Sequence, residues 1–204
     1  MVKAVRSRTR DDPEVRREQI LEAAIRILGE RGYYGFTVQE LAQRCGLTNG
    51  GVLYHFGSKE QLLLAVLQER DRRDTEIVIS VAGPAAREAK RSDSSLSAVL
   101  EVFRAIVTRS AARPEITRLD TVLQAEALDR AHPAHDYFQA REARLLGVFA
   151  RIVAPHVADP PATARQLLAL MGGLQLQWLR GEQAFDLVVE WDCAVAALLR
   201  RPPP

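Results

Sequence analysis

The chain has 204 residues, of which 47% are apolar and 26% are charged, which excludes a largely disordered chain and allows a substantial core. A formal net charge of +2 is too small to indicate a polyanionic partner by itself. The polar N-terminus is no signal peptide, and no apolar run approaches the roughly 20 residues of a membrane span, so we expect a cytoplasmic protein without a membrane partner.

In the N-terminal segment 1–12, the first ten residues include no acidic residue and four basic ones, Lys3, Arg6, Arg8 and Arg10. Such an arm is either a solvated tail or a source of salt-dependent phosphate and minor-groove contacts. Apolar residues then recur at helical spacing without the alternation of strands, which predicts an all-α chain of about eight to ten helices. The first helix is expected over Glu14 to Arg31, started by Asp12-Pro13 and ended by Gly32.

Residues 37–60, TVQELAQRCGLTNGGVLYHFGSKE, predict two short helices around a glycine turn. Thr37 opens a capping box, and Gly46 is placed to end the first of these helices in the left-handed conformation. Thr48 is expected to cap the second, over about 49–56, with a turn of the length found in a helix-turn-helix unit.

The second of these helices is too short to be stable alone, and Gly50 and Gly51 weaken it further. Val52 and Phe56 can dock it on a core, which leaves Asn49, Gly50, Leu53 and His55 near the open side. Small residues at a helix start permit close approach, and the free backbone N–H groups there suit phosphate. The segment therefore predicts contact with DNA.

A fourth helix is expected from Ser58 to about Val81, with Lys59 in its first turn either solvated or facing a phosphate. Gly83-Pro84 and the polar stretch 91–95 then break the chain, and a larger helical bundle follows. Its helices are expected over about 95–111, 114–130, 134–157, 160–180 and 184–201.

The last two expected helices lack a clear polar side, and 166–179 contains no charged residue at all. Such helices need one neighbour inside the subunit and one outside it, and Gly172-Gly173 permits close approach. Pairing across a two-fold axis predicts a dimer, while burial within a monomer is the alternative. The residues predicted for the interface are Leu167, Met171, Leu174, Trp178, Val188, Trp191, Val195 and Leu199.

Residues 14–67, through the stretch ILEAAIRILGERGYYGFTVQELAQRCGLTNGGVLYHFGSKEQLLLAV, resemble the TetR family of bacterial transcriptional regulators. The resemblance implies a flexible arm (1–12), a three-helix helix-turn-helix DNA-binding head (13–57), a linking helix (58–82) and a ligand-binding and dimerisation bundle (83–204). It also implies a homodimeric repressor that binds a palindromic double-stranded DNA operator and is released by a small-molecule effector. A non-catalytic sensor or carrier without specific DNA readout is the alternative.

Carried over by position, the family's phosphate contacts fall on Thr37, Thr48, His55 and Lys59, and its base-reading positions on Gln39, Asn49, Gly50 and Gly51. The chain departs from the family at Leu53, where an aromatic residue is usual, and Tyr54 follows one place later. Leu53 is a candidate for contact with a thymine methyl group. Tyr54 either faces DNA or packs against the first helix.

Aromatic and amide side chains within apolar helices are the candidates for the effector pocket, with ordinary packing as the alternative: Phe103, Gln124, Tyr137, Gln175 and Trp178. Because Pro133 separates His132 from His135, we expect a helix junction capped by His135 or Asp136 rather than a metal site. No nucleophile with a base, phosphate loop or carboxylate pair stands out, so we expect neither an enzyme nor a cofactor. The cysteines, Cys45 and Cys193, are expected to be core residues.

Overall fold

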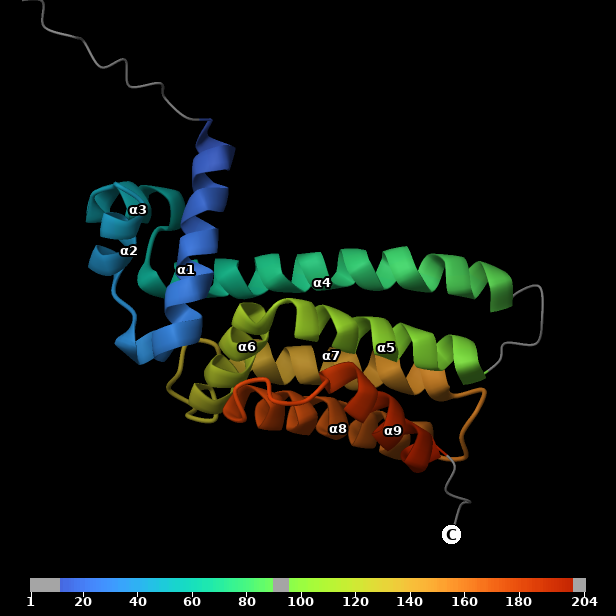
Figure 1. The fold of residues 1–204 in the computed structure, drawn as a ribbon. Helices are drawn as coiled ribbons and strands as arrows, with labels where there is room; N and C mark the ends of the chain where they lie inside the picture. Colours follow the sequence, from blue (N-terminus) through green and yellow to red (C-terminus); the bar gives the residue numbers. More distant parts are fainter. Residues whose placement is uncertain (1–11, 90–95, 200–204) are drawn as a thin grey trace, which may run out of the picture.

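The computed structural model describes residues 12–89 and 96–199, and these ranges form nine helices (Figure 1). The helices are α1 (Pro13–Gly35), α2 (Val38–Arg44), α3 (Asn49–Phe56), α4 (Lys59–Ala89), α5 (Leu96–Ala112), α6 (Pro114–Glu126), α7 (His135–Val153), α8 (Pro160–Arg180) and α9 (Leu187–Leu199). Within the described ranges, none of them has both the length and the apolar character that crossing a membrane requires.

The first three helices form a head at one end of the molecule, and α4 leads from it along the remaining helices (Figure 1). The head has its own apolar core, built from α1, α2, α3 and the first turns of α4. Residues of α6 complete that core, namely Ile116, Leu119 and Leu123. The head is therefore packed directly against the body, because α6 lies against α1.

A second core fills the bundle of α5, α7, α8 and α9. Its largest fully buried side chain is Trp191, which lies beside Phe103. Phe103 in turn meets Phe149 edge to face, with ring centroids 4.8 Å apart. The body of the protein is therefore stabilised by aromatic packing that is separate from the core of the head.

The predicted helix boundaries were right at several places and wrong at others. Helix α8 has the predicted bounds, whereas α6 and α7 end earlier than predicted. The prediction that the fourth helix ends near Val81 was wrong, because α4 runs to Ala89. Gly83-Pro84 therefore lies inside α4. The final helix starts after Asp186, whose carboxylate accepts the N–H groups of Val188 and Val189 at 2.9 and 3.1 Å.

Other predictions concern residues beyond the described ranges. The basic arm and the break at 91–95 lie outside the described residues, as do the last residues predicted for the final helix. The predicted boundary between residues 82 and 83 falls within α4.

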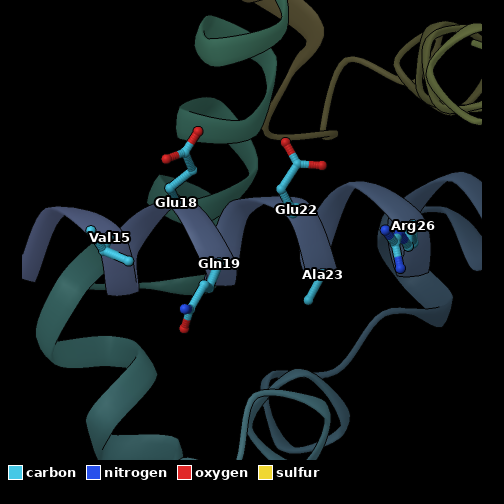
Figure 2. A pocket seen from close by; sticks show the side chains of 6 residues that line it. All are labelled: Val15, Glu18, Gln19, Glu22, Ala23 and Arg26. Carbon is cyan, nitrogen blue, oxygen red and sulfur yellow. The ribbon is translucent and has the colours of Figure 1, made fainter. Parts of the chain in front are cut away.

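A shallow hollow of about 380 Å³ lies along α1. Figure 2 shows Glu18 and Glu22 extending from one side of the helix, and Gln19 and Ala23 from the other. Both glutamates pair with Arg73 of α4, with Glu18 at 3.7 Å. These ion pairs join α1 to α4.

Candidate nucleic-acid interface

The turn between α2 and α3 fixes how these two helices are oriented. Gly46 has a φ of 64°, the left-handed conformation that favours glycine, and the Leu47 N–H donates to the Ala42 carbonyl at 2.8 Å. Together these features form a Schellman motif. The Thr48 hydroxyl then accepts the Gly51 N–H at 3.1 Å and caps α3. The glycine turn and this cap are as predicted.

Helix α2 is held against the end of α1 by charges as well as by its core. The Thr37 hydroxyl accepts the Glu40 N–H at 3.1 Å, which is half of the predicted capping box. The Glu40 carboxylate pairs with Arg31 of α1 and with Arg44, both at 3.1 Å. Helix α2 therefore provides a fixed platform for α3.

Helix α3 has one buried side and one open side. Val52 and Phe56 are buried in the core of the head, whereas Asn49 and Gly50 are exposed. None of the ten residues predicted to contact DNA is buried. They are Thr37, Gln39, Thr48, Asn49, Gly50, Gly51, Leu53, Tyr54, His55 and Lys59.

The position of Tyr54 distinguishes the two alternatives left open by the sequence. Its side chain is 87% exposed, so it does not pack against α1. Its ring meets the neighbouring His55 edge to face, with centroids 5.5 Å apart. Leu53 is only half-buried. Both side chains are therefore accessible to a ligand on the open side of α3.

Lys59 lies in the first turn of α4, after Ser58, whose hydroxyl accepts the Gln61 N–H at 3.2 Å. Its ammonium lies 4.3 Å from the centroid of the Tyr33 ring. Burial lowers the pKa of Lys59, and the carboxylate of Glu60 counteracts that effect. The lysine is therefore held beside the head rather than extended into solvent.

Gly50 provides a test of close approach to DNA. An added Cβ would meet only the Thr48 hydroxyl, at 3.9 Å, so the protein has room for alanine there. Gly50→Ala is expected to stabilise α3 by up to about 1 kcal/mol. If a DNA surface packs against this position, affinity for a specific duplex should nevertheless fall about tenfold, or about 1.4 kcal/mol.

Thermal unfolding and fluorescence anisotropy with labelled duplexes measure these two effects separately. Gly147→Ala is the matched control, because Gly147 is also helical and its added Cβ would meet only Arg151 Nη1, at 3.8 Å. If the Gly50 variant bound DNA as the wild type does, Gly50 would not be a point of closest approach.

A cavity of about 850 Å³ lies between α4, α5, α6, α7 and α8. Much of its wall is apolar, with side chains that include Val102, Ile106, Phe149, Ile152, Leu168 and Met171. The Gln175 amide reaches this wall and donates to the Ser110 hydroxyl at 2.9 Å. An apolar cavity of this size with a few polar groups suits a small organic molecule.

One wall of the cavity carries a buried ionic cluster centred on Arg70, which is 2% exposed. Arg70 pairs with Asp120 and, at 3.0 Å, with Asp71. Arg141 and the Tyr137 hydroxyl also bond to Asp71. Burial alone would raise the pKa of Asp71, but Arg70, Tyr137 and Arg141 together lower it. These charges therefore stabilise one another inside the body.

Sequence reasoning missed this cluster, although a signal for it exists. The apolar stripe of α4 ends at Leu67, and Arg70, Asp71 and Asp74 continue it at helical spacing. Charged residues in the continuation of a buried stripe indicate buried ion pairs. Burial is strong enough there to raise the pKa of Asp74 despite its neighbouring arginines.

Of the five residues predicted for the effector pocket, some line the cavity and others do not. Gln124 and Gln175 line the cavity. Phe103 lies in the aromatic core of the body, and Trp178 is 4% exposed in the same core. The Tyr137 hydroxyl is engaged by Asp71 and by the backbone carbonyl of Leu67. Ordinary packing therefore accounts for Phe103 and Trp178, while Tyr137 supports the wall.

The residues predicted for a dimer interface lie mostly on the inner sides of α8 and α9. Buried within the protomer are Leu167, Met171, Trp178, Trp191 and Val195, while Leu174, Val188 and Leu199 are partly buried. A buried side chain cannot provide exposed surface for a partner, so the choice of face was wrong for those five. The outward sides instead carry Leu176, 38% exposed, and Val189, 54% exposed.

The histidine pair marks a helix junction, as predicted, but neither His135 nor Asp136 caps α7. The N-cap is Ala134, whose N–H donates to His132 Nδ1 at 3.1 Å. In the described ranges no three His, Cys, Asp or Glu side chains are grouped as metal ligands would be. Cys45 is partly buried, whereas Cys193 is exposed, contrary to the prediction of a core position.

Comparison with known proteins gives consistent matches. The profile of the family described as "Bacterial regulatory proteins, tetR family" matches residues 20–66. The HTH-type transcriptional repressor AcnR of Corynebacterium glutamicum is 43% identical over 68 residues, 33% of this chain and 36% of AcnR. The chain thus matches about a third of the length of that relative.

Other matches cover most of the chain, and two of them serve as examples. The HTH-type transcriptional regulator BetI of Burkholderia thailandensis is 30% identical over 187 residues, 84% of each chain. The structure of the transcriptional regulator FadR from Bacillus subtilis, in complex with stearoyl-CoA, aligns with a TM-score of 0.67 and 15% identity. That alignment covers 90% of this chain and 97% of FadR, so the similarity of fold includes the body.

Proposed function

Because this chain belongs to the TetR family of DNA-binding bacterial transcriptional regulators, which are not enzymes, we propose that it is a homodimeric repressor acting in the cytoplasm. It binds a palindromic operator through α3 and is released by a small molecule that enters the cavity of the body. The observation that carries the proposal is the open side of α3. That side is rigidly supported and carries Asn49, Gly50 and Tyr54 exposed.

In the proposed complex, some residues of the head contact DNA bases and others contact the sugar-phosphate backbone. Asn49 and Gln39 read base edges from the major groove, and Leu53 contacts a thymine methyl group. The phosphate contacts are Lys59, His55 and the starts of α2 and α3 at Thr37 and Thr48. Tyr54 lies against the sugar-phosphate backbone, which its exposure supports.

The cavity between α4 and α8 is the proposed effector site. Its apolar wall and its polar groups, among them Gln124 and Gln175, suit a molecule with a long apolar part. FadR, a protein of similar fold, was crystallised with stearoyl-CoA. Binding in the cavity and binding of DNA by the head are then coupled in free energy.

We place the proposed dimer interface on the outward sides of α8 and α9. Leu176 and Val189 project there, and Gly172 is exposed on the same helix as Leu176. Exposed apolar side chains together with small residues favour close packing of helices across a two-fold axis. Such a dimer presents two copies of α3 to the two halves of a palindrome.

Selection from a random duplex library tests the proposed function, and Asn49 supplies its sharpest variant. The wild-type protein is expected to enrich a palindrome. Asn49→Ala should lose preference at one base pair in each half-site, by about 1 to 3 kcal/mol. Lys59→Ala is the contrasting variant, because loss of a phosphate contact weakens binding to all sequences alike.

Competition titrations with operators mutated at single positions measure the preference. An Asn49→Ala protein that kept the complete wild-type preference would show that α3 is oriented differently on DNA. A wild-type protein that enriched no sequence would reject the repressor and leave a sensor or carrier without specific DNA readout.

A further inference from the structure

A break in α1 brings the body into contact with the DNA-binding head. Gly32 has a φ of 69° and a ψ of −177°, so the helical pattern is interrupted there. The N–H of the next residue, Tyr33, donates to the carboxylate of Glu126 at 2.7 Å. An added Cβ on Gly32 would lie 2.1 Å from Glu126 Oε1. Glycine therefore provides both the conformation and the space that this carboxylate requires.

Glu126 is the last residue of α6, and its carboxylate is largely enclosed. The side chain is 22% exposed, and Oε2 lies 3.7 Å from Nε2 of the buried His132. The His132 ring also meets the Tyr33 ring edge to face, with centroids 5.1 Å apart. These contacts fix the carboxylate at the interruption of α1.

Tyr33 connects Glu126 to the start of α4. Its hydroxyl donates to Glu60 at 2.9 Å, and its ring lies 4.3 Å from the Lys59 ammonium. Phe36 adds a second ring, 5.6 Å from the same ammonium. A cation over aromatic faces is held without the loss of its charge. The ammonium position therefore depends on where Tyr33 is held.

Burial of the Lys59 ammonium works against its charge, and nearby carboxylates offset that cost. Burial lowers the pKa of Lys59, whereas the negative charges of Glu60 and Glu126 raise it. Glu126 thus acts on Lys59 in two ways, through the position of Tyr33 and through its own charge.

We propose that Glu126 is a positioning residue for DNA binding, which holds Tyr33 so that Lys59 is presented to a DNA phosphate. This inference rests on the proposed function of the chain as a DNA-binding repressor. Glu126 does not contact DNA in this proposal, and its whole effect passes through the head. An acidic residue of the body therefore favours the binding of a polyanion, which simple charge repulsion would not predict.

A double-mutant cycle on operator affinity tests the proposal. The operator is the duplex that the wild-type protein enriches, and affinity is measured over a range of salt concentrations for the wild type, E126A, K59A and E126A/K59A. We expect E126A to lower affinity about tenfold and to reduce the salt slope by about one, as K59A does. The double variant should bind little more weakly than either single variant, because both changes remove the same phosphate contact.

Two further variants separate positioning from general damage. E126Q keeps an acceptor for the Tyr33 N–H and should restore most of the affinity. E115A removes an exposed carboxylate from the same helix and should leave affinity and salt slope unchanged. Circular dichroism establishes that each variant is folded. If E126A does not fold, the cycle is run with E126Q, which should show a smaller loss of the same non-additive kind.

Failure of the inference about Glu126 and failure of the proposed function give different results. If the losses from E126A and K59A multiply, or if E126A leaves the salt slope unchanged, Glu126 does not act through Lys59 and the inference is rejected. If the wild-type protein enriches no DNA sequence at all, the proposed function itself fails.

Discussion

Replacing Asp120 by alanine is expected to lower the free energy of unfolding by about 3 kcal/mol, because it removes one partner of a buried ion pair. The guanidinium of Arg70 is almost fully buried and would keep Asp71 as its remaining partner. That carboxylate is already shared with Tyr137 and Arg141. Urea unfolding at a fixed protomer concentration measures the change, since stability and dimerisation are linked.

Two comparisons test whether burial of the Arg70–Asp120 ion pair causes the expected loss of stability. The double variant Arg70→Met/Asp120→Leu should be more stable than Asp120→Ala, because neither ion of the pair remains uncompensated. Asp192→Ala breaks an exposed pair with Arg104 at 2.9 Å and should cost at most about 1 kcal/mol. Equal losses for Asp120→Ala and Asp192→Ala would show that the cluster stabilises the body no more than a surface pair does.

Replacing Trp191 by alanine is expected to lower the free energy of unfolding by about 3 to 5 kcal/mol, the usual cost of emptying a buried aromatic site. Its side chain is completely buried in the protomer beside Phe103. A partner subunit therefore cannot pack directly against it. Under conditions where the variant stays folded, dimerisation should be little changed, and sedimentation velocity measures this directly.

Val189 lies on the same helix as Trp191, but its side chain is exposed rather than buried. It is 54% exposed, so Val189→Glu should leave protomer stability nearly unchanged while adding charge to the proposed interface. The expected result is a shift to monomers in sedimentation and a loss of operator affinity. A full-strength Val189→Glu dimer, or a folded but monomeric Trp191→Ala protein, would reject the reassigned faces.

The head could be predicted from the sequence because its signals are local. Gly46, Thr48 and Ser58 each act on backbone groups within a few residues of themselves, so their spacing determines where helices end and begin. Val52 and Phe56 are four residues apart, which defines the buried side of α3 without knowledge of the remaining chain.

The body could be predicted only in outline, because its decisive contacts join distant segments. Helix α8 lacks charged residues over 166–179, so periodicity could not show which side faces inward. Trp178 and Trp191 were predicted to lie in the dimer interface, whereas both side chains are buried in the core of the protomer. The cavity needs five helices to be placed together, and the Glu126 contact joins residues 93 positions apart. No local pattern contains that information.

Helix α6 of the body completes the core of the head, which limits the bodies to which this head can be joined. Leu119 and Leu123 of α6 are fully buried in that core, and the carbonyl of Glu115 lies 3.2 Å from where a Cβ on Gly29 would be. A chimera that joined this head to an unrelated body would uncover apolar surface unless the new body reproduced the face of α6. Under the proposed readout, operator specificity is changed by substitutions on the open side of α3, whereas transfer of the whole head requires a body with a compatible α6.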